Sequence, residues 1–505
     1  MTKNLFKKVL VANRGEIAVR IIRACSELDI QTVAVYSEAD RKSLHVQMAD
    51  EAVCIGPPQA VESYLDMGRI CEAVRETGAE AVHPGYGFLA ENFLFARKCE
   101  EKGIVFVGPN SRSMELVGDK VRSRITMEKA GVPIIPGMKG IHKHLEDYAA
   151  EADKIGYPVM IKASAGGGGK GMRIARRAEE LLPGIEAGQR EAKGAFGDDS
   201  VYLEKYIEEP RHVEFQILAD NHGHVVHLFE RECSIQRRHQ KIIEESPSTA
   251  LDAELRSRMG DVAKKVIQAT GYNNAGTVEF LLDKDRNFYF LEVNARLQVE
   301  HPVTELVTGI DLVHQQLQIA AGENLSLKQE DLKQTGHAIE CRIYAEDPHH
   351  DFLPSSGRVL YLSEPAGPGI RNDCGIYSGC EVPIYYDPIL AKLIVWGENR
   401  SMACDRMVQA LRNYVVLGVK TSIGFLRDVI GHSAFRSGRT TTSFIPTHFS
   451  DWTDTVGNQG VLGLIAAAAA FEAVHRKKPG RGASKSRKDI NTPWQSLGHW
   501  RMGGE

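Results

Sequence analysis

The sequence predicts an α/β protein (α+β overall) in which three structural units follow one another along 505 residues. Short apolar runs alternate with stretches of helical periodicity in the N-terminal part, and this alternation is typical of a parallel sheet covered by helices. A Pro- and Gly-rich segment at 131–140 precedes a second α/β region, and strand-like runs recur in a third region from about residue 336. A chain of this length also predicts three domains, at about 150 residues per domain.

The first unit, residues 1–115, begins with strand–helix–strand: an apolar strand at 8–12, a helix at 16–28 and a second strand at 31–36. Apolar residues recur in the helix at the spacing that places them on one face. The turn at 13–16 reads Asn-Arg-Gly-Glu and lacks the GxGxxG spacing of a dinucleotide site. We therefore expect a Rossmann-like scaffold that does not bind NAD.

The second unit, residues 116–330, contains four consecutive glycines at 166–169. Packing does not explain them, because each glycine loses backbone entropy when it becomes ordered. They let successive N–H groups approach an anion closely, as in a mobile loop over phosphates. Gly171 follows Lys170 where a Walker A loop has Ser or Thr. A flexible surface hairpin is the alternative, and Lys162 on the preceding strand, placed to contact phosphate oxygens, argues against it.

Two further segments of this unit fit a nucleotide. The segment 201–207 offers its backbone and the carboxylate of Glu204 to an adenosine. The segment 234–241 concentrates cationic and titratable side chains, a pattern that usually marks a solvated face. Ile235 and the pair at 242–243 bracket this run, so we expect a partly sheltered strand that faces anions.

Two strands of the second unit, at 277–282 and 287–291, predict a hairpin in which Glu279 faces Glu292 directly across the pair. Like charges in that position destabilise a sheet, and carboxylates among apolar residues need a partner. A divalent cation with oxygen ligands removes the conflict, and Asn294 supplies a third oxygen donor. The alternative is a pair of solvated carboxylates on an edge hairpin, against which the flanking Phe and Leu residues argue.

A row of polar residues continues beyond this hairpin. Side chains alternate along a strand, so every second residue points the same way. If the pleat continues past Glu292, one face carries Asn294, Arg296, Gln298 and Glu300. Acids, amides and a guanidinium in such a row are unusual for a structural strand, and they predict a functional site.

Composition excludes several classes of function. The formal net charge is −4, so there is no overall attraction to nucleic acid or to an anionic membrane. The nine cysteines are scattered without a CxxC pair, which favours reduced thiols in the cytosol over disulfides or a zinc site. The N-terminus leaves no room for a signal or transit peptide, and the longest apolar block, 461–471, is too short to cross a bilayer. We expect a cytoplasmic protein without nucleic-acid or membrane partners.

The third unit, residues 331–449, carries strand-like runs at 338–343, 359–362 and 390–395. The remaining residues, 450–505, contain an Ala-rich helix, a basic Gly/Ser/Pro-containing linker and a tail. A basic run of that composition is usually a solvated linker.

Taken together, these motifs resemble the biotin carboxylase family, the ATP-grasp component of biotin-dependent carboxylases. The matching segments follow the order of the family and lie at 12–18, 83–89, 118–120, 162–171, 231–241 and 292–302. The resemblance covers residues 1–449. It implies ATP-dependent carboxylation of biotin by bicarbonate through carboxyphosphate. It also implies an ATP-grasp domain with a glycine-rich lid in the second unit and a mixed, β-rich biotin carboxylase C-terminal domain in the third.

The resemblance implies roles for individual residues. The implied ATP contacts are Lys120, Lys162, Gly168, Gly169, Glu204, Lys205, Tyr206, Ile207, His212, Gln236, His239, Glu279 and Glu292. The implied ligands of Mg²⁺ or Mn²⁺ are Glu279, Glu292 and Asn294, in agreement with the hairpin argument. The implied bicarbonate site consists of Lys241, Arg296, Gln298 and Val299, with Glu300 as the base. Arg342 is expected to contact biotin and stabilise its enolate, and Tyr86 is expected to line the same pocket.

The C-terminal segment 492–504 is similar to the segment that opens the next domain of acyl-CoA carboxylase α-chains, yet no Ala-Met-Lys-Met biotin-acceptor motif follows it. We therefore expect biotin to arrive on a separate biotin carboxyl carrier protein, with carboxyltransferase subunits completing an acyl-CoA or 2-oxo-acid carboxylase. The family also predicts a homodimer.

Two alternatives remain open. A bicarbonate-activating ATP-grasp enzyme of the carbamoyl-phosphate synthase type would share the nucleotide and bicarbonate residues but has no reason to carry Arg342. A non-catalytic ATP-binding subunit is the second alternative. Intact Lys241, Arg296 and Glu300 argue against it, because proteins that lose activity usually lose such residues.

Overall fold

The computed structural model describes residues 5–138, 145–163, 172–196, 198–453 and 469. The chain divides into two units, residues 1–452 and 453–505. The second unit lies outside the described residues apart from Thr453 and Ala469, and with it lie the Ala-rich helix, the basic linker and the tail expected there.

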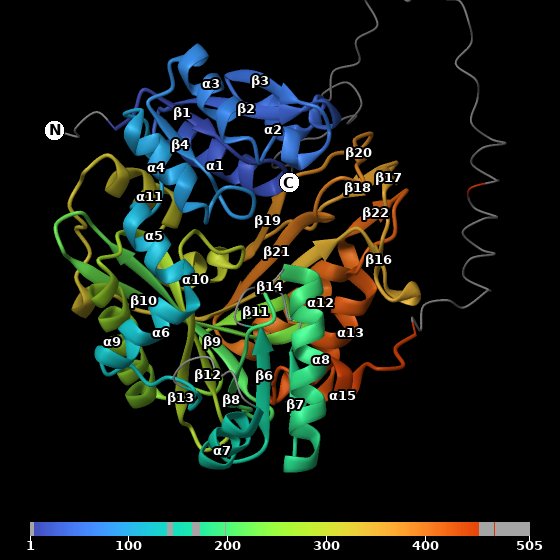
Figure 1. Ribbon diagram of the computed structural model, residues 1–505. Coiled ribbons are helices and arrows are strands. Elements are labelled where there is room, and N and C mark those ends of the chain that lie inside the picture. The colour runs from blue at the N-terminus through green and yellow to red at the C-terminus, as the bar shows by residue number, and fades with distance from the viewer. Residues whose placement is uncertain (1–4, 139–144, 164–171, 197, 454–468, 470–505) are drawn as a thin grey trace, which may run out of the picture. The chain divides into compact units, whose positions relative to one another are not determined.

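A parallel sheet with the strand order β3-β2-β1-β4-β5 forms the N-terminal part of the first unit (Figure 1). Its strands are β1 (Lys8–Val11), β2 (Gln31–Ser37), β3 (Glu51–Gly56), β4 (Ala81–His83) and β5 (Val105–Phe106). The accompanying helices are α1 (Gly15–Glu27), η1 (Glu38–Asp40), α2 (Leu44–Met48), η2 (Ala60–Glu62), α3 (Met67–Thr77) and α4 (Phe93–Glu101). The Rossmann-like scaffold is confirmed, and strand β3 is an addition to the predicted elements.

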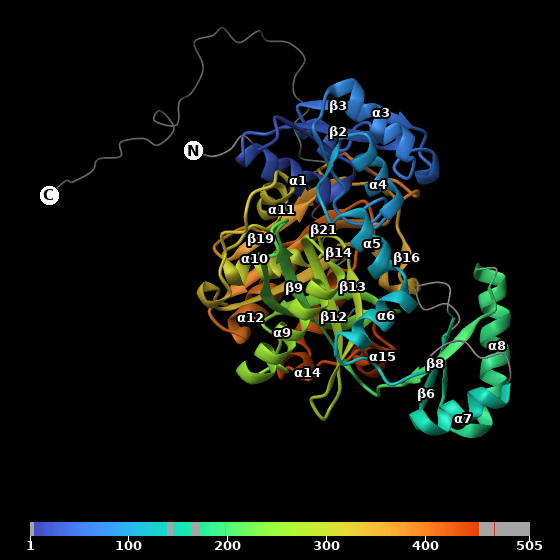
Figure 2. The ribbon, with the colours of Figure 1, turned by 60° about the vertical axis from the view of Figure 1, so that its left-hand side comes forward.

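A small subdomain, which we call the lid, follows the N-terminal part (Figure 2). Two helices and a linker at 130–138 lead to it: α5 (Ser111–Gly118) and α6 (Lys120–Lys129). The lid consists of α7 (Leu145–Ile155), β6 (Val159–Ala163), β7 (Arg173–Ala175), α8 (Ala178–Phe196) and β8 (Val201–Lys205), with the strand order β7-β6-β8. It has a core of its own, in which buried Val159, Ile161, Leu181 and Val201 pack together.

One large antiparallel sheet forms the centre of the molecule, with the strand order β13-β12-β9-β10-β11-β14-β21-β19. Its strands are β9 (Arg211–Ala219), β10 (Val225–Arg237), β11 (Gln240–Ser246), β12 (Asn274–Leu282), β13 (Phe288–Asn294), β14 (His337–Tyr344), β19 (Ile370–Cys374) and β21 (Ile389–Gly397). Strands of the second and third predicted units thus share one sheet, because β11 pairs with β14. The domain boundary expected at residue 330 stays a prediction, and the sheet crosses it.

Helices and short strands surround this sheet. The helices are α9 (Ala253–Thr270), α10 (His301–Thr308), α11 (Leu312–Ala320), η3 (Gln329–Asp331), η4 (Pro348–His350), α12 (Arg400–Asn413), α13 (Ile423–Gly431), α14 (Ser433–Arg436) and α15 (Phe444–His448). The short strands are β15 (Glu346–Asp347), β16 (Leu353–Pro354), β17 (Gly357–Arg358), β18 (Tyr361–Ser363), β20 (Glu381–Val382) and β22 (Val415–Leu417). Within the described part of the chain, no helix has both the length and the apolar character needed to span a bilayer.

The central sheet has one apolar face and one polar face in its ATP-grasp half. On β9, Val213, Phe215 and Ile217 join the hydrophobic core that includes Leu255 and Met259 of α9. Side chains alternate along a strand, so the intervening residues of β9 project to the opposite face. These residues are polar, and the functional side chains gather on their side of the sheet.

Candidate functional site

The predicted hairpin is confirmed, and its register is the expected one. Glu279 of β12 lies opposite Glu292 of β13, and Thr277 lies opposite Asn294. An irregularity between Glu279 and Phe280 shifts the pairing toward the turn by one residue. The two acids differ in environment, because Glu279 is buried and Glu292 is exposed. The facing carboxylates thus span the boundary between the interior and the solvent.

Buried Glu279 is ionised and held by four neighbours. One carboxylate oxygen accepts from Lys241 Nζ at 2.7 Å, Asn294 Nδ2 at 2.7 Å and Gln298 Nε2 at 3.3 Å. The other oxygen lies 2.8 Å from His212 Nε2. Burial alone would raise the pKa of Glu279, but the charges of Lys241 and His212 outweigh it and hold the pKa well below its usual value.

The polar row beyond Glu292 converges through a turn and not through a pleat. Strand β13 ends at Asn294, and α10 begins at His301, so the expected continuation of the strand is wrong. The Arg296 guanidinium nevertheless donates to Gln298 Oε1 at 2.7 Å and to Asn294 Oδ1 at 3.1 Å. The turn therefore brings together side chains that a straight strand would have spread along its length.

Lys241 is the centre of the buried cluster. Its ammonium donates to Glu214 at 2.6 Å, to Glu279 at 2.7 Å and to Glu300 at 2.8 Å. A lysine has three N–H donors, so all of them are satisfied by carboxylates. Burial would lower the pKa of Lys241, but these three acids raise it well above its usual value. Lys241 is therefore a permanent cation.

Glu300 lies between two cations at the start of α10. Its oxygens accept from Lys241 Nζ at 2.8 Å and from the Arg342 guanidinium at 3.0 Å. Arg342 also donates through Nε to Glu244 at 2.6 Å. Burial of Glu300 would raise its pKa, yet Lys241, Arg342 and Arg231 hold it well below the usual value. The wholly buried Glu300 is consequently an ionised acceptor with two cationic neighbours.

Three contributors to the cluster were not among the predicted residues: Glu214, Arg231 and Glu244. Fully buried Arg231 donates to Glu214 at 2.6 Å, so Glu214 links two cations. A signal for Glu214 does exist in the sequence. His212, Glu214 and Gln216 alternate with apolar residues on β9, so a polar face on a buried strand can be recognised without the structure.

The expected nucleotide residues of the lid are placed in part. Lys162 on β6 donates to Glu204 on β8 at 2.5 Å, and the other oxygen of Glu204 accepts from Arg124 of α6 at 2.7 Å. The ammonium of Lys205 instead donates to the carbonyls of Gly156 and Tyr157 at 2.8 and 2.9 Å. Lys205 can thus meet a nucleotide only through its backbone.

The other expected nucleotide contacts have diverse positions. Gln236 Nε2 lies 2.7 Å from His212 Nδ1, which ties Gln236 to Glu279 through the imidazole. His239 is exposed at the turn between β10 and β11, and Tyr206 and Ile207 follow the end of β8. The side chain of Lys120 and both Gly168 and Gly169 lie outside the described residues.

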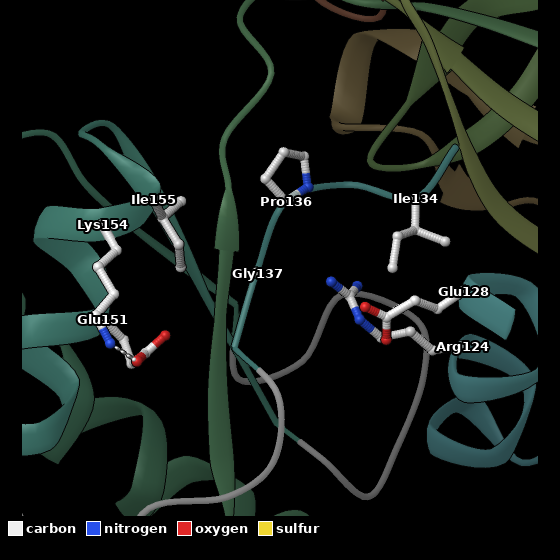
Figure 3. Close-up of a pocket in the computed structure, with 8 residues that line it drawn as sticks. All are labelled: Arg124, Glu128, Ile134, Pro136, Gly137, Glu151, Lys154 and Ile155. Atoms are coloured by element: carbon white, nitrogen blue, oxygen red, sulfur yellow. Dashed lines mark hydrogen bonds and ion pairs between the residues drawn. The ribbon is translucent and has the colours of Figure 1, made fainter. Parts of the chain in front are cut away.

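The linker to the lid joins two sheet edges. Ile134 pairs with Phe290 of β13, and Gly137 pairs with Glu204 of β8. A cavity of about 340 Å³ lies at this linker, between α6 and α7 (Figure 3). Its walls are formed by Arg124, Glu128, Ile134, Pro136, Gly137, Glu151, Lys154 and Ile155. Among the described residues, none of the expected nucleotide contacts lines it, so we regard the cavity as part of the hinge.

Tyr86 and Val299 lie near each other through Lys392 of β21. The Lys392 ammonium donates to the Val299 carbonyl at 3.1 Å and lies 5.6 Å from the centre of the Tyr86 ring. The buried hydroxyl of Tyr86 has no hydrogen-bond partner among the described residues. A buried hydroxyl without a partner is costly, and this cost is offset if a ligand contacts it.

Family models match this chain in succession from end to end of the first unit. They are described as "Biotin carboxylase, N-terminal domain" over residues 5–114, "Carbamoyl-phosphate synthase L chain, ATP binding domain" over residues 119–328, and "Biotin carboxylase C-terminal domain" over residues 340–447. The order of these matches is the order of the units expected from the sequence.

Individual proteins give the same relationship. Biotin carboxylase 1 of Bacillus subtilis is 54% identical over 445 residues, which are 88% of this chain and 99% of that protein. The mitochondrial methylcrotonoyl-CoA carboxylase subunit alpha of Dictyostelium discoideum is 49% identical over 498 residues, which are 98% of this chain and 70% of that protein.

Solved structures share the fold. The biotin carboxylase domain of the 2-oxoglutarate carboxylase from Hydrogenobacter thermophilus, a dimer in complex with MgADP, ADP and bicarbonate, matches with a TM-score of 0.84 and 51% identity. The match covers 89% of this chain and 100% of that domain.

Proposed function

The chain belongs to the biotin carboxylase family, an enzyme class that carboxylates biotin with bicarbonate and ATP, and we propose which of its residues perform each step. The observation that carries the proposal is Glu300, which is wholly buried and lies 2.8 Å from Lys241 and 3.0 Å from Arg342. An ionised base between two cations is suited to a substrate that is itself an anion carrying a proton.

Bicarbonate is activated in the cluster around Lys241. Arg296, Gln298 and Lys241 hold the anion, and the backbone of Val299 completes the site. Glu300 takes the bicarbonate proton, and the freed oxygen attacks the γ-phosphorus of ATP, so that ADP leaves and carboxyphosphate forms. Bicarbonate is a poor electrophile, and this step converts one of its C–O bonds into a bond to a phosphate leaving group.

The pKa of Glu300 responds to the substrate in a useful direction. Without substrate, Lys241 and Arg342 both donate to Glu300 and hold its pKa well below the usual value. A bound anion competes for these donors, and a carboxylate that loses cationic donors becomes more basic. Glu300 therefore becomes a better base at the moment when bicarbonate is present.

The nucleotide lies between the lid and the central sheet. Lys162, together with Lys120 and the loop of Gly168 and Gly169, offsets the negative charge of the phosphates. Lys162 is 2.5 Å from Glu204 in the nucleotide-free structure, so a phosphate oxygen must replace that carboxylate. Strand β8 offers the backbone from Glu204 to Ile207 to the adenosine.

The divalent cation is expected at Glu279, Glu292 and Asn294. The donor set fits Mg²⁺ or Mn²⁺, because two carboxylates face each other across β12 and β13 and Asn294 adds an amide oxygen. Asn294 Oδ1 accepts from Arg296 at 3.1 Å, so this oxygen must exchange a guanidinium for the metal. The bound cation would supply positive charge next to the nucleotide phosphates.

Biotin meets Arg342 and Tyr86. Carboxyphosphate yields CO₂ and phosphate, and the phosphate removes the N–H proton of the biotin ureido group. Arg342 donates to the oxygen of the resulting enolate, which then attacks CO₂. A planar guanidinium is suited to this task because it presents several N–H donors in a fixed geometry and keeps its charge.

A substitution at Glu300 tests this assignment. Glu300→Gln should abolish bicarbonate-dependent ATP hydrolysis while ATP binding is retained, since the amide keeps the shape but accepts no proton. Glu76→Gln is the matched control, because Glu76 is exposed on α3. Turnover of the Glu300 variant close to that of the wild type would refute the role of Glu300 as the base.

The complex around this enzyme is a further part of the proposal. We infer that biotin is carried by a separate carrier protein and that carboxyltransferase subunits pass the carboxyl group to an acyl-CoA. The 492–504 segment supports the acyl-CoA class, as does the match to a methylcrotonoyl-CoA carboxylase subunit over 98% of this chain. A cytoplasmic homodimer is the proposed setting. Purification of the native complex, with identification of its biotinylated subunit and its acceptor, tests these assignments.

A carbamoyl-phosphate synthase type of activity is the second candidate, because that family's ATP-binding model matches residues 119–328. The two are separated by free biotin. Stimulation of bicarbonate-dependent ATP hydrolysis by biotin supports the first assignment, and stimulation by an amine donor without any effect of biotin supports the second.

A further inference from the structure

Two buried carboxyl groups lie behind Arg342 and have no role in the steps above. Glu244 of β11 is the cross-strand partner of Glu340 of β14, and both are fully buried. Strands β11 and β14 run side by side in the central sheet (Figure 1). Directly opposed side chains have Cβ atoms about 5 Å apart, so these two carboxyl groups are within reach of each other.

The hydrogen bonds of this pair are incomplete if both groups are ionised. Glu244 accepts from Arg342 Nε at 2.6 Å through one oxygen. Its other oxygen and both oxygens of Glu340 have no hydrogen-bond donor among the described residues. Two like charges opposite each other in a sheet, away from water, are strongly disfavoured. A pair of facing carboxyl groups relieves such a conflict by sharing one proton.

A single proton satisfies most of these atoms. An O–H group on one acid donates to the free oxygen of the other, and hydrogen bonds between an acid and a carboxylate are among the strong ones in proteins. The proton belongs on Glu340, since Glu244 already has the cation Arg342 as a donor and Glu340 has none. Burial raises the pKa of both groups, to about 7 for Glu244 and well above the usual value for Glu340.

Other charged and titratable groups around the pair leave this arrangement in place. They are Cys233 of β10, Lys241 of β11, Cys341, Arg342 and Tyr344 of β14, Lys392 of β21, Asp373 of β19, Glu16 of α1 and Glu300 at the start of α10. Lys392 is the cation on the neighbouring strand, but its ammonium lies 3.2 Å from Glu16 and donates to the Val299 carbonyl.

We propose that Glu340 is a protonated acid which donates to Glu244, so that the pair carries one negative charge and positions Arg342 for biotin. Glu244 and Glu300 then divide the guanidinium between them, each with one charge. A second charge on Glu340 would draw Arg342 toward β11 and away from the substrate. Glu244 and Glu340 are positioning residues in this scheme, and the consequence for biotin rests on the proposed role of Arg342.

Infrared difference spectroscopy tests the shared proton without reference to activity. At mildly alkaline pH the wild-type enzyme should show the carbonyl stretch of a protonated carboxylic acid, and Glu340→Gln should remove that band. Glu244→Gln should keep the band and shift its frequency, because the proton stays on Glu340 and loses its carboxylate acceptor. Exposed Glu76→Gln is the control and should change nothing in this region. A band that survives in Glu340→Gln, or that is lost in Glu244→Gln, would overturn the proposal.

Steady-state kinetics tests the positioning role. Glu340→Gln mimics the protonated acid, so its KM for free biotin should stay within about twofold of the wild-type value. Glu244→Gln removes a charged hydrogen bond to Arg342 and should raise the KM for biotin on the order of tenfold, with little change in the KM for ATP. Equal defects in the two variants, or failure of the isosteric Glu340→Gln protein to fold, would contradict the assignment. An enzyme without any response to biotin would instead refute the proposed function and leave the infrared result standing.

Discussion

Removal of the Lys241 charge should destabilise the protein and change how its stability depends on pH. Lys241→Met keeps much of the side-chain volume but leaves Glu214, Glu279 and Glu300 without the ammonium that lies 2.6, 2.7 and 2.8 Å from them. Loss of one partner from a buried ion pair costs about 3 to 5 kcal/mol. Each freed acid can escape by taking up a proton, which at pH 7 costs about 1.4 kcal/mol per unit above its usual pKa of 4.5 and so limits the penalty per acid to about 3.5 kcal/mol.

The sign of the pH effect follows from the carboxyl pKa values. In the wild type, the pKa values of Glu279 and Glu300 lie well below 4.5, so both groups stabilise the fold above that pH and lose this contribution as the pH falls. In Lys241→Met, burial is no longer balanced by the lysine, and their pKa values rise. The difference in unfolding free energy between the two proteins should therefore be largest at neutral pH and shrink as the pH approaches 4.5.

Urea unfolding over this pH range measures the difference directly. Lys284→Met is the matched control, because Lys284 is exposed in the turn between β12 and β13. Its free energy of unfolding should stay within about 0.5 kcal/mol of the wild type at each pH. A Lys241→Met protein whose deficit is constant with pH, or grows as the pH falls, would show that Lys241 does not hold these carboxylates ionised.

Three further outcomes are expected around the lid and the metal. Arg124→Gln should raise the KM for ATP about three- to tenfold, because the lid carboxylate then holds its lysine more tightly, and exposed Arg122→Gln should not. Gly137→Ala should cost about 1 to 3 kcal/mol in urea unfolding, since its Cβ would lie 2.7 Å from a carbonyl oxygen of β8, whereas Gly194→Ala, which meets no atom within 4 Å, should not destabilise. Glu292→Gln should raise the Mg²⁺ concentration needed for ATP hydrolysis at least about tenfold in a metal titration, and an unchanged requirement would exclude Glu292 as a ligand.

Local patterns predict the parts of the molecule that depend on neighbours in sequence. The N-terminal strands and the β12–β13 hairpin follow from periodicity and turn residues, and the hairpin register places Glu279 opposite Glu292 as expected. The burial of these two acids is not local. Glu279 is covered by Lys241 and His212 from other strands, whereas the exposed Glu292 lies on the edge strand β13.

The contacts that sequence reasoning missed connect strands that are distant along the chain. Arg342 and Glu244 are 98 residues apart, and Arg124 and Glu204 are 80 residues apart. Alternation on a strand reveals which face is polar, but not which strand will be its neighbour. The order β9-β10-β11-β14 decides that Glu214, Lys241 and Glu244 share a site with Arg342. That order is a property of the whole sheet, set by packing on both faces.

Each described cation expected to bind a substrate anion already has a carboxylate partner in the substrate-free molecule. Lys162 is paired with Glu204, Lys241 with Glu300, and Arg342 with Glu244 and Glu300. Unpaired cations would bind the anions more tightly, but a buried unpaired charge is costly and binds phosphate and bicarbonate indiscriminately. Exchange of partners keeps the interior close to neutral before and after binding. It also frees a carboxylate for each anion that enters, and for bicarbonate the freed group is Glu300, the residue that must accept the proton.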